Sequence, residues 1–400
     1  MAKTVTLGAV GDIDFSGATG ENIRKRGFAW PFRKMLPHLR KADLLFGNME
    51  SVTLPPGYPA DAVDPAGLVG AFNATPALLE AGFDFMCLAN NHVLDGGHAG
   101  MFHTRQAIES LGIATGGVGA TQEEARRMRV IEKHGIRFGF LCYCEDTNYS
   151  LGTRGPCHAY FTLPNILEDI AGNRRNVDIL VVSIHADLEF METPSLPRRE
   201  ISRLIARAGA SIILEHHPHV PQGVERVGGC LIAYSLGNFY FRAQSMAYMR
   251  EHSPHTGHSF LLLAEVSKKG VQAFDRVPFV IPKPPEERPT PLAGKARREM
   301  LAYLEDLDNK VRNDDLVRRN WRDIAMRHLH VYLDRVLRGE YTKERLIDDV
   351  LGRLLLVREN RQWVDEAFAV IREDWERRQS ELDPHHRPYY RYTRPPGTGR

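Results

Sequence analysis

The sequence is poor in cysteine, and its cysteines are not arranged to pair or to bind zinc. Five cysteines are scattered along 400 residues, with no Cys-x-x-Cys motif among them. An odd and scattered set is typical of free thiols in a reducing compartment rather than of a disulfide framework. The chain also shows no signal-peptide pattern and no run of 18 apolar residues. We therefore expect a cytoplasmic protein without a membrane anchor.

An excess of charge of one sign is also missing. The 52 lysines and arginines nearly balance the 50 aspartates and glutamates, and the net charge is +2. This balance argues against nucleic acid as a general partner. The glycine-rich stretch 112–119 does not form a G-x-G-x-x-G pattern after a strand, so it gives little support for a dinucleotide site. The hydrophobic content of 43% is sufficient for a large core.

The order of apolar and polar segments predicts two structured regions. Short buried strands alternate with helical patterns over residues 1–282, which is typical of an α/β domain. The segment 283–292 is rich in proline and predicts a stiff linker. Residues 293–382 are rich in charge and read as a helical extension, whose apolar stripes pack on the first domain or on each other. The polar tail, 383–400, is expected to be mobile.

Polar residues gather where the expected strands end, which is where open α/β folds hold their chemistry. Any single member has an ordinary explanation as a turn or helix-capping residue. Five such clusters at five successive strand ends are hard to explain by chance. The members are Asp12 and Asp14, Asn48 and Glu50, Asn91 and His92, His185, and His217 and His219.

The side chains in these clusters are of the kinds that bind divalent metals. Carboxylates, amides and imidazoles together suit Mn²⁺, Fe²⁺ or Zn²⁺. His217 and His219 stand on either side of Pro218, so both rings can face one cavity. The candidates exceed the needs of one ion. Two ions that share a carboxylate would use them and could hold an anionic reacting group, and a remaining histidine would serve in acid–base catalysis.

Several motifs of the chain, taken in order, resemble those of one protein family. They are Gly11-Asp12, Gly47-Asn48-Met49-Glu50, Ala89-Asn90-Asn91-His92 with Asp95, His185 with Glu189, His216-His217-Pro218-His219-Val220 with Gln222, and Tyr234-Ser235-Leu236-Gly237-Asn238-Phe239. This order is similar to the CapA family of poly-γ-glutamate capsule-synthesis proteins, in the calcineurin-like metallophosphatase superfamily. The resemblance covers about residues 4–282. It implies a four-layer α/β/β/α sandwich with a metal site at the strand ends.

The resemblance also implies two ions that share Glu50 as a bridging ligand. The ligands of the first ion would be Asp12, Glu50 and His219, with Asp14 as an optional further ligand, and those of the second would be Glu50, Asn91, His185 and His217.

Catalytic and substrate-binding roles follow from the same resemblance and from two departures from it. His92 would occupy the position of the catalytic acid, with His185 and Asp12 as the other catalytic candidates. The chain has His185-Ala186-Asp187 where the family usually has His-Trp-Gly, which alters the substrate-side wall. It also has Glu215-His216 where a glycine usually precedes His-Pro-His. The candidate substrate-binding residues are Asn48, Asp187, Glu189, His216 and Asn238.

Three functions are compatible with the sequence. The complete ligand set favours metal-assisted hydrolysis or transfer at a phosphoester or at a peptide-like amide such as polyglutamate. The alternative is a metal-independent Cα epimerase that modifies a ribosomally made precursor peptide, such as a lasso peptide. That reaction needs only an acid and a base on opposite faces of one carbon and a stabilised oxyanion. A non-catalytic scaffold is the third, although buried charges without a function are costly.

Overall fold

The computed structural model describes residues 4–58, 67–71, 73–145, 155–339, 342 and 358–382. The chain divides into two compact units, Met1–Val317 and Arg318–Arg400. The tail predicted to be mobile, 383–400, lies outside the described residues.

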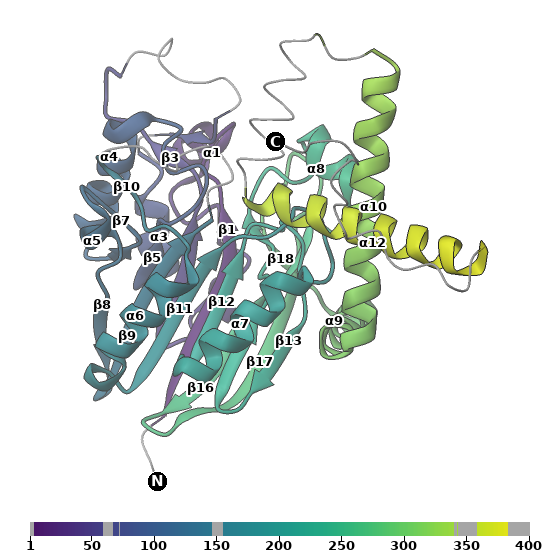
Figure 1. Ribbon diagram of the computed structural model, residues 1–400. Coiled ribbons are helices and arrows are strands. Elements are labelled where there is room, and N and C mark those ends of the chain that lie inside the picture. Colours follow the sequence, from purple (N-terminus) through teal and green to yellow (C-terminus); the bar gives the residue numbers. More distant parts are fainter. Residues whose placement is uncertain are drawn as a thin grey trace. The chain divides into compact units, whose positions relative to one another are not determined.

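The first unit contains two large β-sheets (Figure 1). The first sheet has the strand order β18-β17-β16-β1-β2-β5-β6, with β15 paired to β1, and the second has the order β13-β14-β12-β11-β9-β8. The strands of the first sheet are β1 (Val5–Ile13), β2 (Leu44–Met49), β5 (Phe85–Cys87), β6 (Ala114–Gly116), β15 (Asn238–Tyr240), β16 (His258–Ser267), β17 (Gly270–Val280) and β18 (Thr290–Pro291). Those of the second are β8 (Arg129–Lys133), β9 (Ile136–Cys144), β11 (Ile179–His185), β12 (Ile212–His216), β13 (Val224–Val227) and β14 (Cys230–Ala233).

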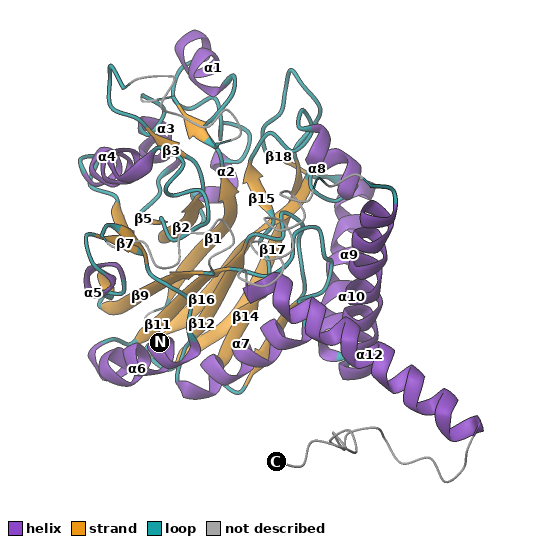
Figure 2. Cartoon of the chain, turned by 45° about the horizontal axis from the view of Figure 1, so that its top comes forward, coloured by secondary structure: helices purple, strands orange, loops and turns teal. Residues whose placement is uncertain are grey.

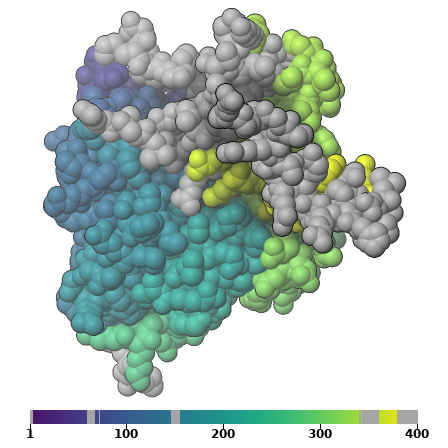
Figure 3. All heavy atoms as spheres, in the orientation of Figure 1, coloured from purple at the N-terminus to yellow at the C-terminus, as the bar shows by residue number. Residues whose placement is uncertain are grey.

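Helices cover the outer faces of both sheets. Those of the first unit are α1 (Thr19–Arg26), α2 (Leu36–Leu39), α3 (Pro76–Ala81), α4 (Gly97–Glu109), α5 (Gln122–Ala125), α6 (Leu163–Asn173), α7 (Leu196–Ala208), α8 (Ala247–His252) and α9 (Gly294–Arg312). Two short ribbons, β3 (Val52–Thr53) with β4 (Val69–Gly70) and β7 (Val118–Gly119) with β10 (Cys157–His158), lie in the connections. The space-filling view shows a continuous surface of side chains over α6 and α7 (Figure 3).

The alternation of side chains along the strands creates three apolar layers. In β11, Val181 packs between the two sheets, whereas its neighbours Leu180 and Val182 pack with residues of α6 and α7. The rings of Phe85 and Phe140, one from each sheet, stack at 4.2 Å between centroids. The third layer joins the first sheet to α2, α3 and α4. The predicted four-layer α/β/β/α sandwich is therefore confirmed.

The parallel strands bring their carboxyl ends to one edge of the sandwich, the upper edge in Figure 1. β1, β2 and β5 run parallel in the first sheet, as do β9, β11 and β12 in the second. Figure 2 turns this edge toward the reader. Residues that follow these strands are consequently neighbours in space although they lie far apart in the sequence.

The first unit extends beyond the predicted linker. Residues 290–291 form β18, which pairs with β17 at the edge of the sheet, where proline is tolerated. Helix α9 packs against β13 and β17, and its Leu304 and Leu307 join the core between the sheets. The buried face of α9 places it with the α/β unit, and the division falls after Val317.

The second unit contains, in its described part, most of α10 (Asp314–Leu337) and α12 (Arg358–Leu382). The ring of Trp363 is nearly fully buried and contacts His328 and Tyr332 on α10. The helical character predicted for this end of the chain is confirmed. Among the residues that the structure describes, no helix combines the length and the apolar character needed to cross a membrane.

Candidate metal centre

Most of the predicted site residues meet at the upper edge of the sandwich. They come from the ends of β1 and β2 in one sheet and of β11 and β12 in the other, or directly follow those strands. Their side chains are almost completely buried. This cluster consists of Asp12, Asn48, Glu50, His185, His217 and His219.

Glu50 lies at the centre of the cluster and has no hydrogen-bond donor. The residue is fully buried, and neither carboxylate oxygen has a hydrogen-bond partner among the described residues. Its Oε1 lies 3.7 Å from Nε2 of His185 and 3.7 Å from Nε2 of His219. Burial, with the nearby carboxylates of Asp12 and Asp14, raises the pKa of Glu50 well above its usual value. A carboxylate in this setting is costly unless a cation or a proton balances it.

His185 brings a second group of ligand atoms around one point. Its Nε2 lies 2.8 Å from Oδ1 of Asn91, 3.1 Å from Nδ1 of His217 and 3.7 Å from Oε1 of Glu50. Atoms bound to one tetrahedral zinc-like ion lie about 3.4 Å apart. Two imidazole nitrogens as close as those of His185 and His217 share either a proton or a cation. The structure thus brings together the four residues implied for the second ion.

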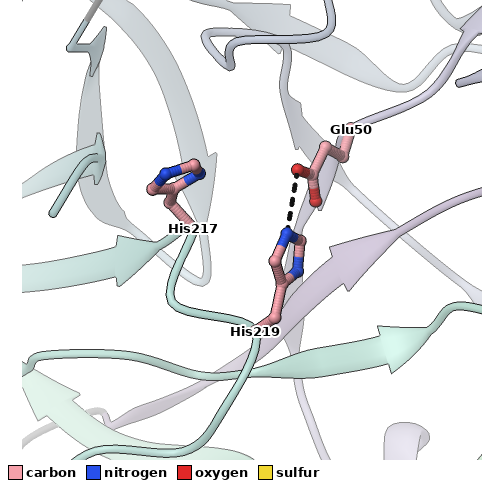
Figure 4. A group of neighbouring side chains, drawn as sticks. All are labelled: Glu50, His217 and His219. Atoms are coloured by element: carbon pink, nitrogen blue, oxygen red, sulfur yellow. Dashed lines mark ion pairs between the residues drawn. The ribbon is translucent and has the colours of Figure 1, made fainter. Parts of the chain in front are cut away.

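The histidines of this group are held in the neutral form that binds metals. Burial lowers the pKa of His217 to about 4 and that of His185 well below its usual value. A neutral imidazole keeps a lone pair for a cation. Glu50, His217 and His219 each offer one ligand atom within 4.8 Å of the others. Figure 4 shows these three side chains turned toward a common space.

The turn after β12 aims both of its histidines at this space. His217 and His219 have φ angles of 100° and 56°, in the left-handed region that residues other than glycine rarely adopt. Pro218 stands between them, and its carbonyl accepts a hydrogen bond from the backbone N–H of Phe190 at 2.8 Å. Such backbone strain persists where the surrounding structure holds it, and it is concentrated at functional sites.

Asp12 reaches the cluster because of the glycine before it. A Cβ at Gly11 would lie 1.7 Å from the carbonyl oxygen of Gly237, so only glycine permits this approach of β1 to the Gly237 turn. Oδ1 of Asp12 accepts a hydrogen bond from Asn48 at 2.8 Å and lies 3.4 Å from Nδ1 of His216. Burial alone would raise the pKa of Asp12, but the interaction with His216 holds it below the usual value. Asp12 therefore presents an anionic carboxylate.

Asn238, predicted to bind substrate, contacts His219. The amide nitrogen of Asn238 donates to the carbonyl oxygens of His219 and Thr256, at 3.2 and 3.0 Å. Its Oδ1 therefore faces the imidazole, 2.9 Å from Nδ1 of His219, and accepts the proton of that nitrogen. The lone pair of His219 is then on Nε2, the atom that faces Glu50. Partners of this kind fix the ring and the tautomer of metal-binding histidines.

Replacing Asn238 with alanine is expected to weaken metal binding by about 10- to 100-fold, because the ring of His219 loses the acceptor that fixes it. Titration of the metal-depleted protein with Zn²⁺ or Mn²⁺ measures the change. Asn238→Asp is the comparison variant. It keeps an oxygen for Nδ1–H but loses the hydrogen bonds to the carbonyl oxygens of His219 and Thr256, so it should retain more of the affinity than the alanine variant. Equal metal affinity of the alanine variant and the wild type would contradict this role.

His92 lies on the more accessible side of the cluster. Its Nδ1 is 2.7 Å from Oδ2 of Asp95, and the His92 side chain keeps 21% of its exposure. The same carboxylate oxygen accepts the backbone N–H of Leu68 at 2.6 Å. Asp95 thus fixes the ring through Nδ1. The catalytic role of His92 stays a prediction.

Asp14, the optional ligand of the first ion, is engaged elsewhere. Oδ1 accepts the backbone N–H of Ser16 at 2.7 Å, and Oδ2 accepts the Ser16 hydroxyl at 2.6 Å. Nε of Arg242 donates to Oδ2 at 3.1 Å. Three donors from Ser16 and Arg242 therefore satisfy this buried carboxylate.

The other candidates for substrate binding differ in their exposure. His216 is fully buried, and its ring stacks on Phe46 between the sheets. Asp187 is buried and accepts the backbone N–H of Ser195, the N-cap residue of α7. Glu189 keeps 26% side-chain exposure and lies 3.9 Å from Nε2 of His219. Of these three side chains, that of Glu189 is the most exposed.

Asn48, the remaining candidate, lies inside the cluster and holds two ligands. Its Nδ2 donates to Asp12 at 2.8 Å and lies 3.2 Å from Nδ1 of His185. Its Oδ1 has no hydrogen-bond partner among the described residues.

Two contacts near the centre were not predicted from the sequence. One is the pair of Arg242 with Asp14. The other is a buried ion pair of Arg198 with Glu215, the residue two positions before His217. The unusual Glu215 was a signal for the second pair, but no sequence feature distinguishes Arg242 from the many other basic residues.

A four-layer α/β sandwich with a buried carboxylate–histidine cluster at its strand ends defines the class of α/β proteins to which this chain belongs. Within this class, the chain belongs to the family described as bacterial capsule synthesis protein PGA_cap, whose model matches residues 6–243. The resemblance to CapA proteins is confirmed.

Relatives in two Bacillus species match about two thirds of the chain. The capsule biosynthesis protein CapA of Bacillus anthracis is 28% identical over 272 residues, which are 65% of this chain and 66% of that protein. The PGA biosynthesis protein CapA of Bacillus subtilis (strain 168) is 27% identical over 280 residues, which are 68% of this chain and 70% of that protein. The chain thus spans slightly less than two thirds of the first relative.

Solved structures show a weaker likeness. A sulfate thiohydrolase (SoxB) from Thermus thermophilus is 12% identical, with a TM-score of 0.36 over 72% of this chain and 48% of its own. A 5'-nucleotidase from Candida albicans is 11% identical, with a TM-score of 0.40 over 79% of this chain and 57% of its own. Likenesses this weak say nothing about the reaction.

Proposed function

We propose that this protein is a cytoplasmic metal-dependent hydrolase or transferase that acts on an amide bond of a peptide or polyglutamate-type chain. The observation that carries the proposal is Glu50, a buried carboxylate without a donor that lies between two histidines. The substrate class is supported by the names of relatives. The CapA of Bacillus subtilis (strain 168) is a PGA biosynthesis protein, and a Mycobacterium tuberculosis relative, 25% identical over 224 residues, is a probable polyglutamine synthesis accessory protein.

The residues around Glu50 fit two divalent ions of the Mn²⁺, Fe²⁺ or Zn²⁺ type. The unsatisfied carboxylate oxygens and the neutral imidazoles are the donors that such ions prefer. When bound, the ions would polarise a carbonyl group and lower the pKa of a water molecule. The first ion would be held by Asp12, Glu50 and His219, and the second by Glu50, Asn91, His185 and His217.

The remaining residues of the centre would position groups and move a proton. Nε2 of His92 would carry the proton that the leaving amine takes, because Asp95 engages the other ring nitrogen. Asn48 would keep Asp12 in place through its amide.

A metal-independent Cα epimerase of a precursor peptide is the second candidate. It is favoured by the hydrogen bonds that link the cluster without a cation, above all those of Asn48 with Asp12 and His185. In that reaction Asp12 and His92 would be the acid–base pair, and Glu50 would carry a proton. No cofactor would be required.

Metal analysis and two activity assays separate these functions. For the hydrolase, we expect about two equivalents of transition metal in the purified protein, and chelator-sensitive cleavage of an oligoglutamate. A protein without metal, whose folding a chelator does not change and which introduces deuterium from D₂O at Cα of a precursor peptide, would refute the hydrolase and establish the epimerase.

A further inference from the structure

Arg242 lies at the edge of the candidate metal centre, where it pairs with the buried carboxylate of Asp14. It follows Phe241, whose ring lies 4.9 Å from that of His219. Its Nε donates to Asp14 at 3.1 Å, and two hydrogen bonds from Ser16 fix the same carboxylate. Asp14 is fully buried, whereas the Arg242 side chain keeps 32% of its exposure. The guanidinium group therefore covers a buried anion and faces outward.

A glycine makes room for this arginine. Gly17 has a φ of 63°, and a Cβ there would lie 2.6 Å from Cδ of Arg242. Any other residue at this position would therefore both strain the turn and push the arginine away. The turn after β1 thus provides a carboxylate for Nε and a flat surface for the aliphatic part of the side chain. Together they restrict the orientation of the guanidinium plane.

The outer end of this guanidinium group is left for another partner. Arginine has five N–H donors, and Asp14 uses only the one on Nε. Among the described residues, none accepts a hydrogen bond from Nη1 or Nη2 of Arg242. These two nitrogens form the end-on face that binds a planar carboxylate with two parallel hydrogen bonds.

We propose that Arg242 binds a carboxylate group of the substrate beside the metal centre and so selects acidic peptide-like chains. The proposal rests on the proposed function for its substrate class, but it concerns binding and not the reaction. Asp14 and Gly17 already restrict the Arg242 side chain, so little further conformational entropy is lost when a carboxylate binds. A chain with regularly spaced carboxylates would place one here while its backbone lies at the metal centre.

Binding of a labelled oligoglutamate tests the proposal. Fluorescence anisotropy with fluorescein-labelled oligoglutamate and with its oligoglutamine counterpart should show that the wild type prefers the acidic chain. Arg242→Met should weaken oligoglutamate binding by about tenfold and leave oligoglutamine binding unchanged. Arg250→Met is the matched control, because Arg250 is an exposed arginine on the neighbouring helix α8, and it should retain the preference.

A second variant guards against misfolding of the first. Gly17→Ala leaves the charge of Arg242 intact but displaces the side chain, so it should reduce the preference for oligoglutamate as well. Circular dichroism and thermal unfolding verify that both variants are folded. A wild type without preference, or an Arg242→Met variant that keeps the preference, would overturn the proposal.

Competition by small anions identifies the group that binds. Acetate should displace oligoglutamate from the wild type at least as well as inorganic phosphate does. Much stronger displacement by phosphate, lost in Arg242→Met, would overturn the assignment to a carboxylate.

Because binding needs no turnover, an Arg242-dependent preference in a protein without hydrolase activity would refute the proposed reaction alone. Hydrolysis that Arg242→Met leaves unchanged, with unchanged binding, would refute this inference alone.

Discussion

Glu50→Gln is expected to lose bound metal and turnover together, while the metal-free protein becomes no less stable. The wild-type carboxylate is fully buried and has no donor on either oxygen. An ion that Glu50 bridges would lose its shared anionic ligand in the glutamine variant. The neutral amide has nearly the same shape, so it removes a costly buried charge without leaving a cavity.

Two measurements on the same variant make this prediction specific. Elemental analysis should find the metal content strongly reduced, and added metal should no longer raise the free energy of unfolding. In the wild type, free metal at about 100 times its dissociation constant adds about 2.7 kcal/mol for each site that it fills. Chelator-treated wild type and Glu50→Gln should unfold at similar denaturant concentrations. A variant that retains its metal, or that unfolds more easily than the chelated wild type, would show that Glu50 is a structural residue.

The location of the centre could be predicted from the sequence because of the strand ends. Apolar strands that end in Asp12, Glu50, His185 and His217 needed only a parallel arrangement to meet at one edge, and β1, β2, β11 and β12 have that arrangement. The sequence also shows the glycine before Asp12. It does not show that this glycine contacts the carbonyl oxygen of Gly237.

Side chains that act through another residue could not be assigned in this way. The family resemblance predicted Asn238 as a substrate-binding residue, but it did not predict the contact of its amide with His219. His216 is the last residue of β12 and His217 follows it, yet the alternation along β12 turns the ring of His216 into the core against Phe46. These directions depend on tertiary contacts that spacing alone does not contain.

The limit of the first unit also depended on tertiary contacts. The segment with several prolines predicted a break in the chain near residue 283, and the charge of the following helix favoured a separate region. One face of α9 nevertheless carries Leu304 and Leu307 into the core of the sandwich. A helix with a charged outer face and an apolar inner face has the same pattern whichever partner it covers.

The buried pair of Arg198 and Glu215 supports the second large prediction, a loss of stability in Arg198→Met. Nε of Arg198 lies 2.9 Å from Oε2 of Glu215, and both side chains are almost fully buried. The guanidinium group also lies 4.3 Å above the ring of Phe161. Removing one partner leaves a charge without compensation, which costs about 3–5 kcal/mol in proteins. Denaturant unfolding should show this loss.

The double variant Arg198→Met/Glu215→Leu is the control. It should recover most of the stability, because it replaces the pair with apolar side chains.

The loss of stability in Arg198→Met is expected to depend on pH, because Glu215 titrates differently in the folded and unfolded states. Burial raises the pKa of Glu215 to about 7, even though Arg198 acts in the opposite direction. Its unfolded value is about 4.3, so between these values the folded state holds more protons and the free energy of unfolding falls as the pH rises. Without Arg198 the folded pKa moves higher, and the fall should continue above pH 7. Arg198→Met should therefore lose more stability between about pH 6 and about pH 8 than the wild type, and the double variant should lose less. An equal slope in Arg198→Met and the wild type would show that Glu215 does not interact with Arg198 in solution.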